Sequence, residues 1–150
     1  MGLMERTKEK AKLIYSDDFI SLYNFEGTNV VLSVAEAEYI PIEHFRSAFY
    51  EIGRLIEQNH WKALIFDKRK LNTFHQPSME WYYTEWKAEM FDKGLNKHYK
   101  ILPEMPWFAK SVEAGKRDIK RNHPSFDFEQ FSVTYVNSIN EALAHYLGTV

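Results

Sequence analysis

The sequence predicts a single α/β domain over residues 11–150, built on a mixed β-sheet. Residues 61–67 contain four consecutive apolar residues and end in Asp67. A run that is apolar on both faces is typical of a strand covered on both sides, in the middle of a parallel or mixed sheet. Segments of helical periodicity stand on either side of it, and strands that alternate with helices favour parallel strands joined by right-handed crossovers. We therefore expect residues 61–67 to form the central strand.

The amino-terminal third predicts three strands before the first helix. A charged arm over residues 1–10, which we expect to be flexible, precedes a first strand near residues 12–15. The side chains then follow a period of two over residues 19–25 and 30–34, on either side of a turn that contains Gly27. This pattern is typical of a β-hairpin.

Four helices are predicted from apolar side chains spaced by three and four residues. Pro41, Pro77 and Pro106 suit the first turns of three of them, because that position needs no N–H partner. Ser138 and Glu141 predict a capping box for the last helix. The expected ranges are 41–59, 77–91, 106–121 and 139–147 for the helices, and 99–102 and 131–136 for the two remaining strands. The predicted order is β-β-β-α-β-α-β-α-β-α.

Composition excludes several classes of function. The 150 residues carry a formal net charge of −2, with 45% hydrophobic and 27% charged residues, which offers no general attraction to nucleic acid or anionic membranes. The absence of cysteine excludes disulfides, thiolate metal sites and cysteine nucleophiles. The first twelve residues lack the apolar core of a signal peptide, and no apolar run approaches transmembrane length. We expect a cytoplasmic protein with no nucleic-acid partner and no transmembrane segment.

A polar loop over residues 68–76 follows Asp67 at the carboxyl end of the central strand, where open α/β sheets usually bind ligands. We expect Asp67, Arg69, Phe74 and His75 to contribute to a ligand or interface surface there. A histidine oriented by a carboxylate is typical of a general base, but no nucleophile accompanies His75, so we assign no catalytic residue. The six histidines show no metal-binding spacing and the six glycines form no phosphate loop, so we predict no metal and no cofactor.

Thr73 and Ser78 are candidate phosphoswitch residues, because they bracket the start of the second predicted helix. A phosphate there would meet free backbone N–H groups and the positive end of the helix dipole. Alternatively, Ser78 serves only the first helical turn and Thr73 only a hydrogen bond within the loop.

The second predicted helix carries more large aromatic residues than one buried stripe holds: Trp81, Tyr82, Tyr83, Trp86 and Phe91. Either they belong to the core, or some of them form a homodimer interface or a groove for an apolar ligand. The candidates for such a surface are Trp81, Trp86 and Phe108. The basic residues that end the third helix are expected to stabilise its carboxyl end rather than to hold a phosphate or lipid head group.

The order of elements, together with scattered residues along residues 11–148, resembles the STAS-like domains, the fold of bacterial anti-sigma-factor antagonists. It resembles more closely the small uncharacterised bacterial proteins described as STAS/SEC14-like or SpoIIAA-like. The residues that carry the resemblance are Asp67, Arg69, Trp81, Trp86, Gly94, Phe108, Ala109, Glu141 and Ala142. Residues 73–78 depart from the phosphorylatable turn of the regulatory STAS domains.

The resemblance implies a non-enzymatic regulatory or protein-interaction module, acting through the second helix and residues 68–78 on an unknown protein partner or as a homodimer. The alternative is a carrier of a small apolar or lipid-like ligand, with Trp81, Trp86 and Phe108 lining a pocket. A sizeable apolar cavity would favour the carrier. An enzyme is the third possibility, and it would require His75 and Asp67 within hydrogen-bond reach in a cleft.

Overall fold

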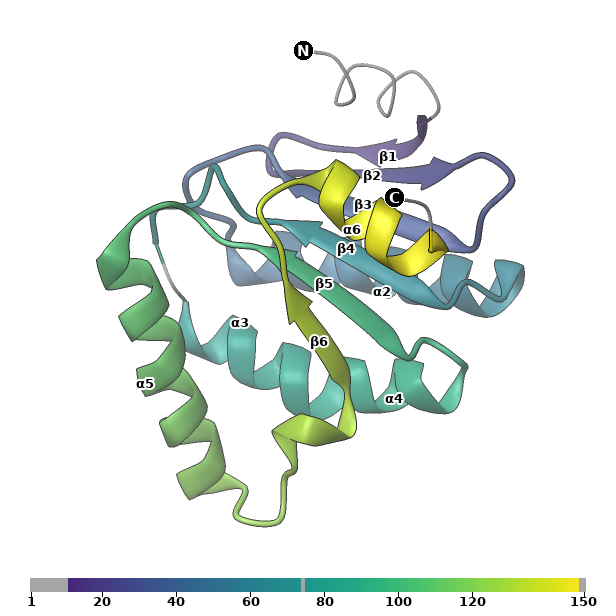
Figure 1. Cartoon of the computed structure of the whole chain (residues 1–150). Coiled ribbons are helices and arrows are strands. Elements are labelled where there is room, and N and C mark those ends of the chain that lie inside the picture. The colour runs from purple at the N-terminus through teal and green to yellow at the C-terminus, as the bar shows by residue number, and fades with distance from the viewer. Residues whose placement is uncertain (1–10, 74, 149–150) are drawn as a thin grey trace.

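Residues 11–73 and 75–148 are described by the computed structural model, in which they form a six-stranded sheet in the order β1–β2–β3–β4–β5–β6 (Figure 1). β1, β2 and β3 pair antiparallel, whereas β3, β4, β5 and β6 pair parallel. The strands are β1 (Ala11–Ser16), β2 (Ile20–Phe25), β3 (Val30–Ala35), β4 (Ala63–Asp67), β5 (Lys97–Ile101) and β6 (Ser132–Tyr135). The predicted α/β class, the hairpin and the parallel later strands are confirmed. The expected arm over residues 1–10 and the candidate Phe74 lie outside the described residues.

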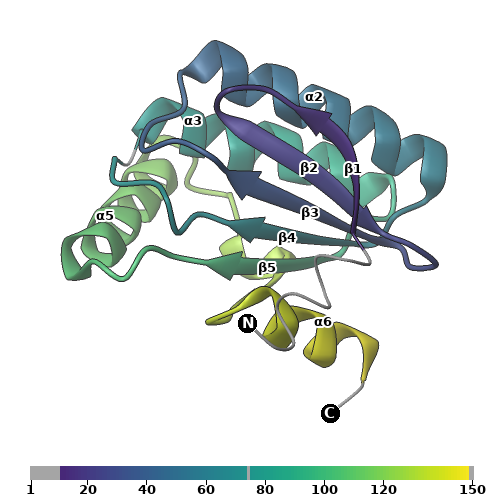
Figure 2. The same ribbon diagram turned by 90° about the horizontal axis from the view of Figure 1, so that it is seen from above.

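The helices lie unequally on the two faces of the sheet. They are α2 (Ile42–Asn59), α3 (Gln76–Trp81), the π-helix η1 (Tyr82–Trp86), α4 (Lys87–Asp92), α5 (Pro106–Asn122), the 3-10 helix η2 (Phe128–Gln130) and α6 (Ile139–Leu147). α3, η1 and α4 follow one another without a break and form the second predicted helix. α2, α3 and α5 lie on one side and α6 on the other (Figure 2). The sheet grows in one direction through three parallel crossovers of the same hand, so their helices share a face.

β4 is the central strand that the sequence predicts. All five of its residues are buried. Leu64 and Phe66 face α2, whereas Ala63 and Ile65 face α6, because successive side chains of a strand point to opposite sides. β5 begins two residues earlier than expected, because Lys97 pairs with Ala63 at the start of β4.

The second helix does not follow the single stripe that its sequence predicts. Its π-helical turn, η1, shifts the phase of the helix, so that neighbouring residues on several sides of it become buried. Trp81 packs edge-on against Phe45 of α2 at 6.1 Å between ring centroids, and the Trp86 indole donates a hydrogen bond to the Phe49 carbonyl at 2.7 Å. Trp81, Trp86 and Phe108 are 6%, 2% and 2% exposed. These aromatic residues therefore form the core, and they offer no surface for a partner.

The ends of the helices agree with the local signals. Ser138 caps α6 by accepting a hydrogen bond from the Glu141 N–H at 3.0 Å, and the Glu141 carboxylate accepts one from the Asn137 N–H at 3.3 Å. Gly148 ends α6 at a φ of 74°, a left-handed conformation that favours glycine. Within the described residues, no helix combines the length and the apolar character that a membrane crossing requires.

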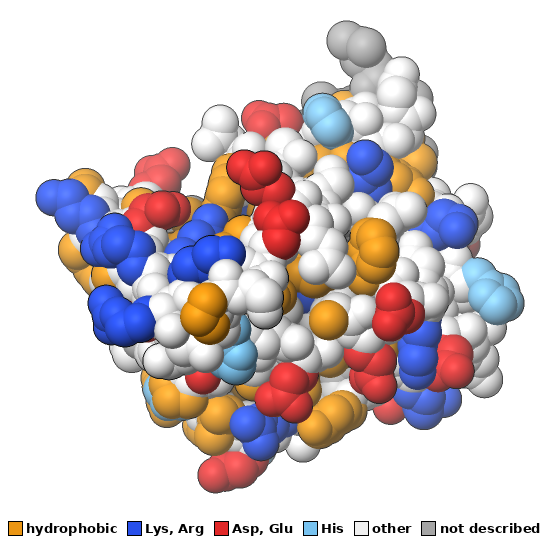
Figure 3. Space-filling model, turned by 90° about the horizontal axis from the view of Figure 1, so that it is seen from below, with side chains coloured by type: hydrophobic (Ala, Val, Ile, Leu, Met, Phe, Trp, Pro, Cys, Tyr) orange, Lys and Arg blue, Asp and Glu red, His pale blue; other side chains and the backbone are white. Residues whose placement is uncertain are grey.

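The basic end of α5 is engaged in local contacts. Arg121 pairs with Asp118 at 3.0 Å, and the Lys120 amine donates to the Phe126 carbonyl at 2.6 Å. Figure 3 shows basic side chains gathered on the side that carries α5, with acidic side chains interspersed over the same face. The arrangement agrees with the expected support of the helix end.

Candidate functional site

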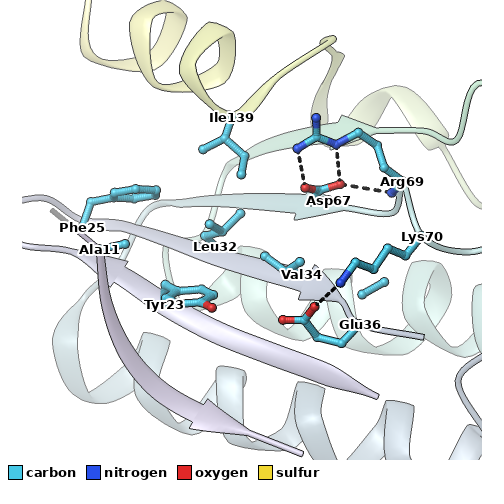
Figure 4. Close-up of a pocket in the computed structure, with 11 residues that line it drawn as sticks. Ala11, Tyr23, Phe25, Leu32, Val34, Glu36, Asp67, Arg69, Lys70 and Ile139 are labelled. Atoms are coloured by element: carbon cyan, nitrogen blue, oxygen red, sulfur yellow. Dashed lines mark hydrogen bonds and ion pairs between the residues drawn. The ribbon is translucent and has the colours of Figure 1, made fainter. Parts of the chain in front are cut away.

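The carboxyl end of β4 is held by a two-pronged ion pair. Asp67 is 6% exposed, and its Oδ1 accepts hydrogen bonds from the backbone N–H and from Nε of Arg69, each at 3.0 Å. Its Oδ2 accepts a third from Nη2 of Arg69 at 2.7 Å (Figure 4). Such a planar match fixes the orientation of the guanidinium as well as its charge. Asp67, the last residue of β4, therefore fixes the start of the loop that follows through its contacts with Arg69.

A second ion pair joins the loop to the neighbouring strand. Lys70 donates to the Glu36 carboxylate at 2.9 Å, just beyond the end of β3. The two pairs lie side by side over the carboxyl ends of β3 and β4 (Figure 4). They place two cations and two anions at one edge of the sheet, with no net charge.

Beside these pairs the α6 face of the sheet contains a cavity of about 390 Å³, which we call the edge hollow. Its polar end is formed by the two ion pairs. Its apolar walls come from β1, β2, β3 and the start of α6, and consist mainly of Ala11, Tyr23, Phe25, Leu32, Val34 and Ile139 (Figure 4). The hydroxyl of Tyr23 forms no hydrogen bond within the described part of the chain. The volume falls within the range of pockets that bind small molecules, about 300 to 1,000 Å³.

A smaller cavity of about 60 Å³, the aromatic recess, lies on the other face of the sheet, behind the same loop. Its apolar wall consists mainly of Ile40, Phe45, Phe66, Leu71, Met79 and Phe108. Its polar lining consists of Tyr39, Lys68, Thr73, His75, Ser78 and Tyr82. The β4–α3 loop thus has a cavity on each side, and the sequence-predicted residues are divided between them.

His75 and Ser78 contact each other rather than Asp67. Nδ1 of His75 accepts hydrogen bonds from the Ser78 hydroxyl at 2.8 Å and from the Ser78 N–H at 3.4 Å, so His75 caps α3. Asp67 is engaged with Arg69 and lines the edge hollow, on the opposite face. The His75–Asp67 pair that an enzyme of the expected kind requires is therefore not formed.

The two candidate phosphoswitch residues differ in access. The Ser78 side chain is buried and bonded to His75, whereas Thr73 is exposed and donates to the Asn72 side chain at 2.9 Å. Both line the aromatic recess. Their phosphorylation stays a prediction, and in this conformation Thr73 is the more accessible hydroxyl.

Lys87 and Lys100 are buried between the helices and the sheet without an ion-pair partner in the described residues. Lys87 is 0% exposed and its Nζ has no hydrogen bond, while Lys100 donates to the Tyr83 hydroxyl at 2.6 Å. Both amines lie over the Tyr83 ring, at 4.1 and 4.3 Å from its centroid. Burial first, and the neighbouring lysine charges second, hold the pKa of both amines well below the usual value. With Lys68 and Lys116, whose charges act on them, they form what we call the lysine cluster.

The edge hollow was not predicted from the sequence, although the order of the helices and strands contains a sign of it. A helix is about 10 Å across and strands lie about 4.8 Å apart, so one helix covers roughly two strands. In the predicted order of elements, three helices connect parallel strands and so lie on one face of the sheet. The last helix connects no strands and packs on the other face. α6 accordingly packs chiefly against β4, and the side chains of β2 and β3 on that face line the hollow.

The lysine cluster was also missed. Lys100 lies in a strand paired on both sides by parallel neighbours, where both faces are covered. Lys87 follows Tyr83 by four residues and so shares its side of the helix. The sequence therefore marked both positions as buried, but it gave no sign that they meet.

No group of three histidine, aspartate or glutamate side chains lies in a metal-binding arrangement within residues 11–73 and 75–148. Comparison of the chain with family models, with curated proteins and with solved structures finds no match. The function must therefore be argued from the geometry of the site, with its edge hollow and aromatic recess.

Proposed function

We propose that this protein is a carrier of a small amphipathic molecule, which lies in the edge hollow with its apolar body between β2, β3 and α6. The observation that carries the proposal is a cavity of about 390 Å³ with apolar walls and two ion pairs at one end. Burial of apolar ligand surface supplies about 25 cal/mol per Å² before the cost of association, so walls of this kind favour binding.

The polar end selects the head group of the ligand. Arg69 uses Nε and Nη2 on Asp67, and its Nη1 has no partner in the described part of the chain. Lys70 has two further N–H donors beside its bond to Glu36, and the Tyr23 hydroxyl has no partner there either. Three groups with unused donors next to an apolar cavity favour a head group that accepts hydrogen bonds, such as a carboxylate, sulfonate or ester carbonyl.

The cavity that supports the carrier lies in a different place from the pocket that the sequence predicts. Trp81 and Trp86 fill the core, and Phe108 borders only the recess of about 60 Å³. The pocket proposed here lies on the opposite face and uses none of these residues. The resemblance to STAS/SEC14-like proteins agrees with a carrier, but the proposal rests on the cavity.

The protein-interaction module stays a prediction, but fewer of the residues predicted for its contact surface are exposed. Trp81, Tyr82, Tyr83 and Trp86 of its aromatic helix are buried, which leaves Phe91 and the exposed positions of the β4–α3 loop, such as Arg69, Lys70 and Thr73. A homodimer also stays a prediction. Both are tested by the same first measurement, because native mass spectrometry reports oligomeric state and bound mass together.

In that measurement the purified protein is sprayed under gentle and then under denaturing conditions. A carrier is expected to show a co-purifying mass that is lost on denaturation. Protein that carries no such mass is then titrated with anilinonaphthalene sulfonate, a fluorescent probe with an apolar body and an anionic head, and binding should be saturable with one site.

Two pairs of variants locate the binding. Val34→Trp places bulk in the hollow and should abolish probe binding, whereas Val133→Trp, at a similarly half-buried strand position outside it, should not. Lys70→Met should weaken binding about three- to tenfold, because one charge-assisted hydrogen bond at an exposed site is worth roughly 1 kcal/mol. Lys93→Met removes a similar lysine, paired with Glu57 at 2.7 Å, and should change nothing.

The proposal fails if the folded Val34→Trp variant binds the probe as tightly as the unaltered protein, since the probe then sits elsewhere. It also fails if neither a co-purified molecule nor the probe binds with a single saturable site.

A further inference from the structure

The amine of Lys68 lies unpaired in the aromatic recess. Its Nζ is 4.9 Å from the centroid of the Phe66 ring, and it forms no ion pair or hydrogen bond in the part of the chain that the structure describes. An unpaired ammonium in apolar surroundings is costly, so such a group shifts towards its neutral form. The recess opens to solvent, and the Lys68 side chain is only half-buried, so small molecules can reach it.

The charge of Lys116 on α5 acts in the same direction. The amines of Lys100 on β5 and Lys87 on α4 also interact with Lys68, and the other titratable side chains that line the recess are Tyr39, His75 and Tyr82. Burial first and the charge of Lys116 second lower the pKa of Lys68 to about 8. At pH 8 about half of the molecules would then carry a neutral amine there, against well under 1% for an ordinary lysine.

Tyr82 also lines the recess, with its hydroxyl buried behind the wall. Tyr82 is 2% exposed, and its hydroxyl has no hydrogen bond within the described residues. Burial raises the pKa of Tyr82, so the group stays protonated and can donate. A buried donor without an acceptor is costly, and a carbonyl oxygen that reached this hydroxyl would satisfy it.

We propose that Lys68 is a covalent site for small apolar aldehydes and ketones, which it binds as an imine in the aromatic recess. The cavity of about 60 Å³ admits a chain of only a few carbon atoms, and its aromatic and aliphatic walls favour an apolar one. The inference concerns a different cavity from the edge hollow and does not depend on it.

The chemistry needs no oxidant or cofactor. The amine lone pair forms a bond to the carbonyl carbon, and the π electrons move to the oxygen, which is hydrogen-bonded by Tyr82 and gains a proton. Nitrogen then loses its two protons as the C=N bond forms, and the C–O bond breaks with release of water. His75 also lines the recess, and with Nδ1 accepting from Ser78 its ring proton is on Nε2, so it can donate to the oxygen while water accepts the protons that leave nitrogen.

The test uses propanal with cyanoborohydride, which reduces an imine to a stable propyl-amine. Peptide mapping then reports the fraction of each lysine that carries propyl, which separates residue 68 from the amino terminus, another amine that titrates in this range. At neutral pH the rate at residue 68 should exceed that at Lys70 at least tenfold. Lys70 is a matched control, because it is two residues away and its hydrogen bond to Glu36 raises its pKa.

The rate at residue 68 should rise with pH through a midpoint near 8, whereas the rate at Lys70 should still be rising at about pH 10. Tyr82→Phe should slow the reaction at residue 68 several-fold while leaving Lys70 unchanged, and its melting temperature shows whether the fold persists. Equal rates at the two lysines in the unaltered protein would overturn the proposal. So would a rate at residue 68 that has no midpoint below about 9.

Discussion

Replacement of Lys87 by methionine should stabilise this protein at neutral pH. The Lys87 amine is wholly buried, has no hydrogen bond in the described residues and lies among the rings of Tyr82, Tyr83 and Phe131. A buried polar group without a partner costs about 1–3 kcal/mol. Methionine has a similar length and no such group, so we expect the free energy of unfolding to rise by roughly 1–2 kcal/mol.

The same substitution should change how stability depends on pH. Burial keeps the folded Lys87 neutral at pH values where the unfolded chain, with an ordinary lysine pKa near 10.4, is protonated. The unfolded state then binds more protons, so the free energy of unfolding rises with pH until the unfolded pKa is passed. One such group contributes a slope of up to about 1.4 kcal/mol per pH unit, and Lys87→Met should remove it.

Urea unfolding followed by tryptophan fluorescence, at several values from about pH 6 to about pH 9, measures both effects. Lys93→Met is the control, because Lys93 lies at the surface in an ion pair with Glu57. A loss of more than about 1 kcal/mol in Lys87→Met at pH 7 would refute the reasoning. It would mean that the amine is charged in the fold and that the surrounding rings hold it by cation–π attraction.

Three further changes test single contacts. Ser138→Ala removes the cap that accepts the Glu141 N–H, and should lower the free energy of unfolding by about 1 kcal/mol. Trp86→Phe removes the indole hydrogen bond to the Phe49 carbonyl and leaves a small void, which should cost about 2 kcal/mol. Although burial alone would raise the pKa of Asp17, the backbone N–H groups of the β1–β2 turn and a tyrosine hydroxyl bond its carboxylate and lower it. Its stabilisation is present above about pH 4 and lost as the pH falls through the folded pKa, so Asp17→Asn should flatten the acid limb of the stability profile.

Each of these changes has a matched control and an outcome that contradicts it. Ser47→Ala, at an exposed position inside α2, should leave stability within about 0.5 kcal/mol, and an equal loss there would deny the capping role of Ser138. Trp107→Phe alters an exposed indole and should be neutral, so a similar loss in both tryptophan variants would deny the importance of the buried bond. Asp18→Asn is exposed and adjacent to Asp17, and an identical effect on the acid limb would show that general charge, not the turn, is responsible.

Much of the fold was predictable because its signals are local. The period-two pattern on either side of Gly27, the prolines in the first turns of α3 and α5 and the cap at Ser138 depend on residues close in the chain, and each is found where it was expected, whereas Pro41 precedes α2 by one residue. The position of Asp67 at the carboxyl end of β4 also follows from one apolar run. Strand boundaries moved by one or two residues, since pairing with a neighbouring strand decides them.

The candidate site was less predictable. Asp67 and His75 are eight residues apart and were expected to contribute to one surface, yet they line cavities on opposite faces of the sheet, since a strand and the loop after it can present side chains to opposite faces. The π-helical turn buries Tyr82, Tyr83 and Trp86 together, which a regular helical period does not allow. No spacing of residues in the sequence predicts that π-helical turn.

The sequence by itself determined the order of the elements, the central strand and the mixed sheet, because each follows from backbone preferences and apolar periodicity within a few residues. The tertiary structure alone decided that, among the described residues, α6 covers only part of its sheet face, that Tyr23 and Leu32 line a cavity with Arg69, and that the amines of Lys87 and Lys100 lie over one ring. These features join residues far apart in the chain. Their energies depend on burial and on the distances between groups, and neither exists until the layers have packed.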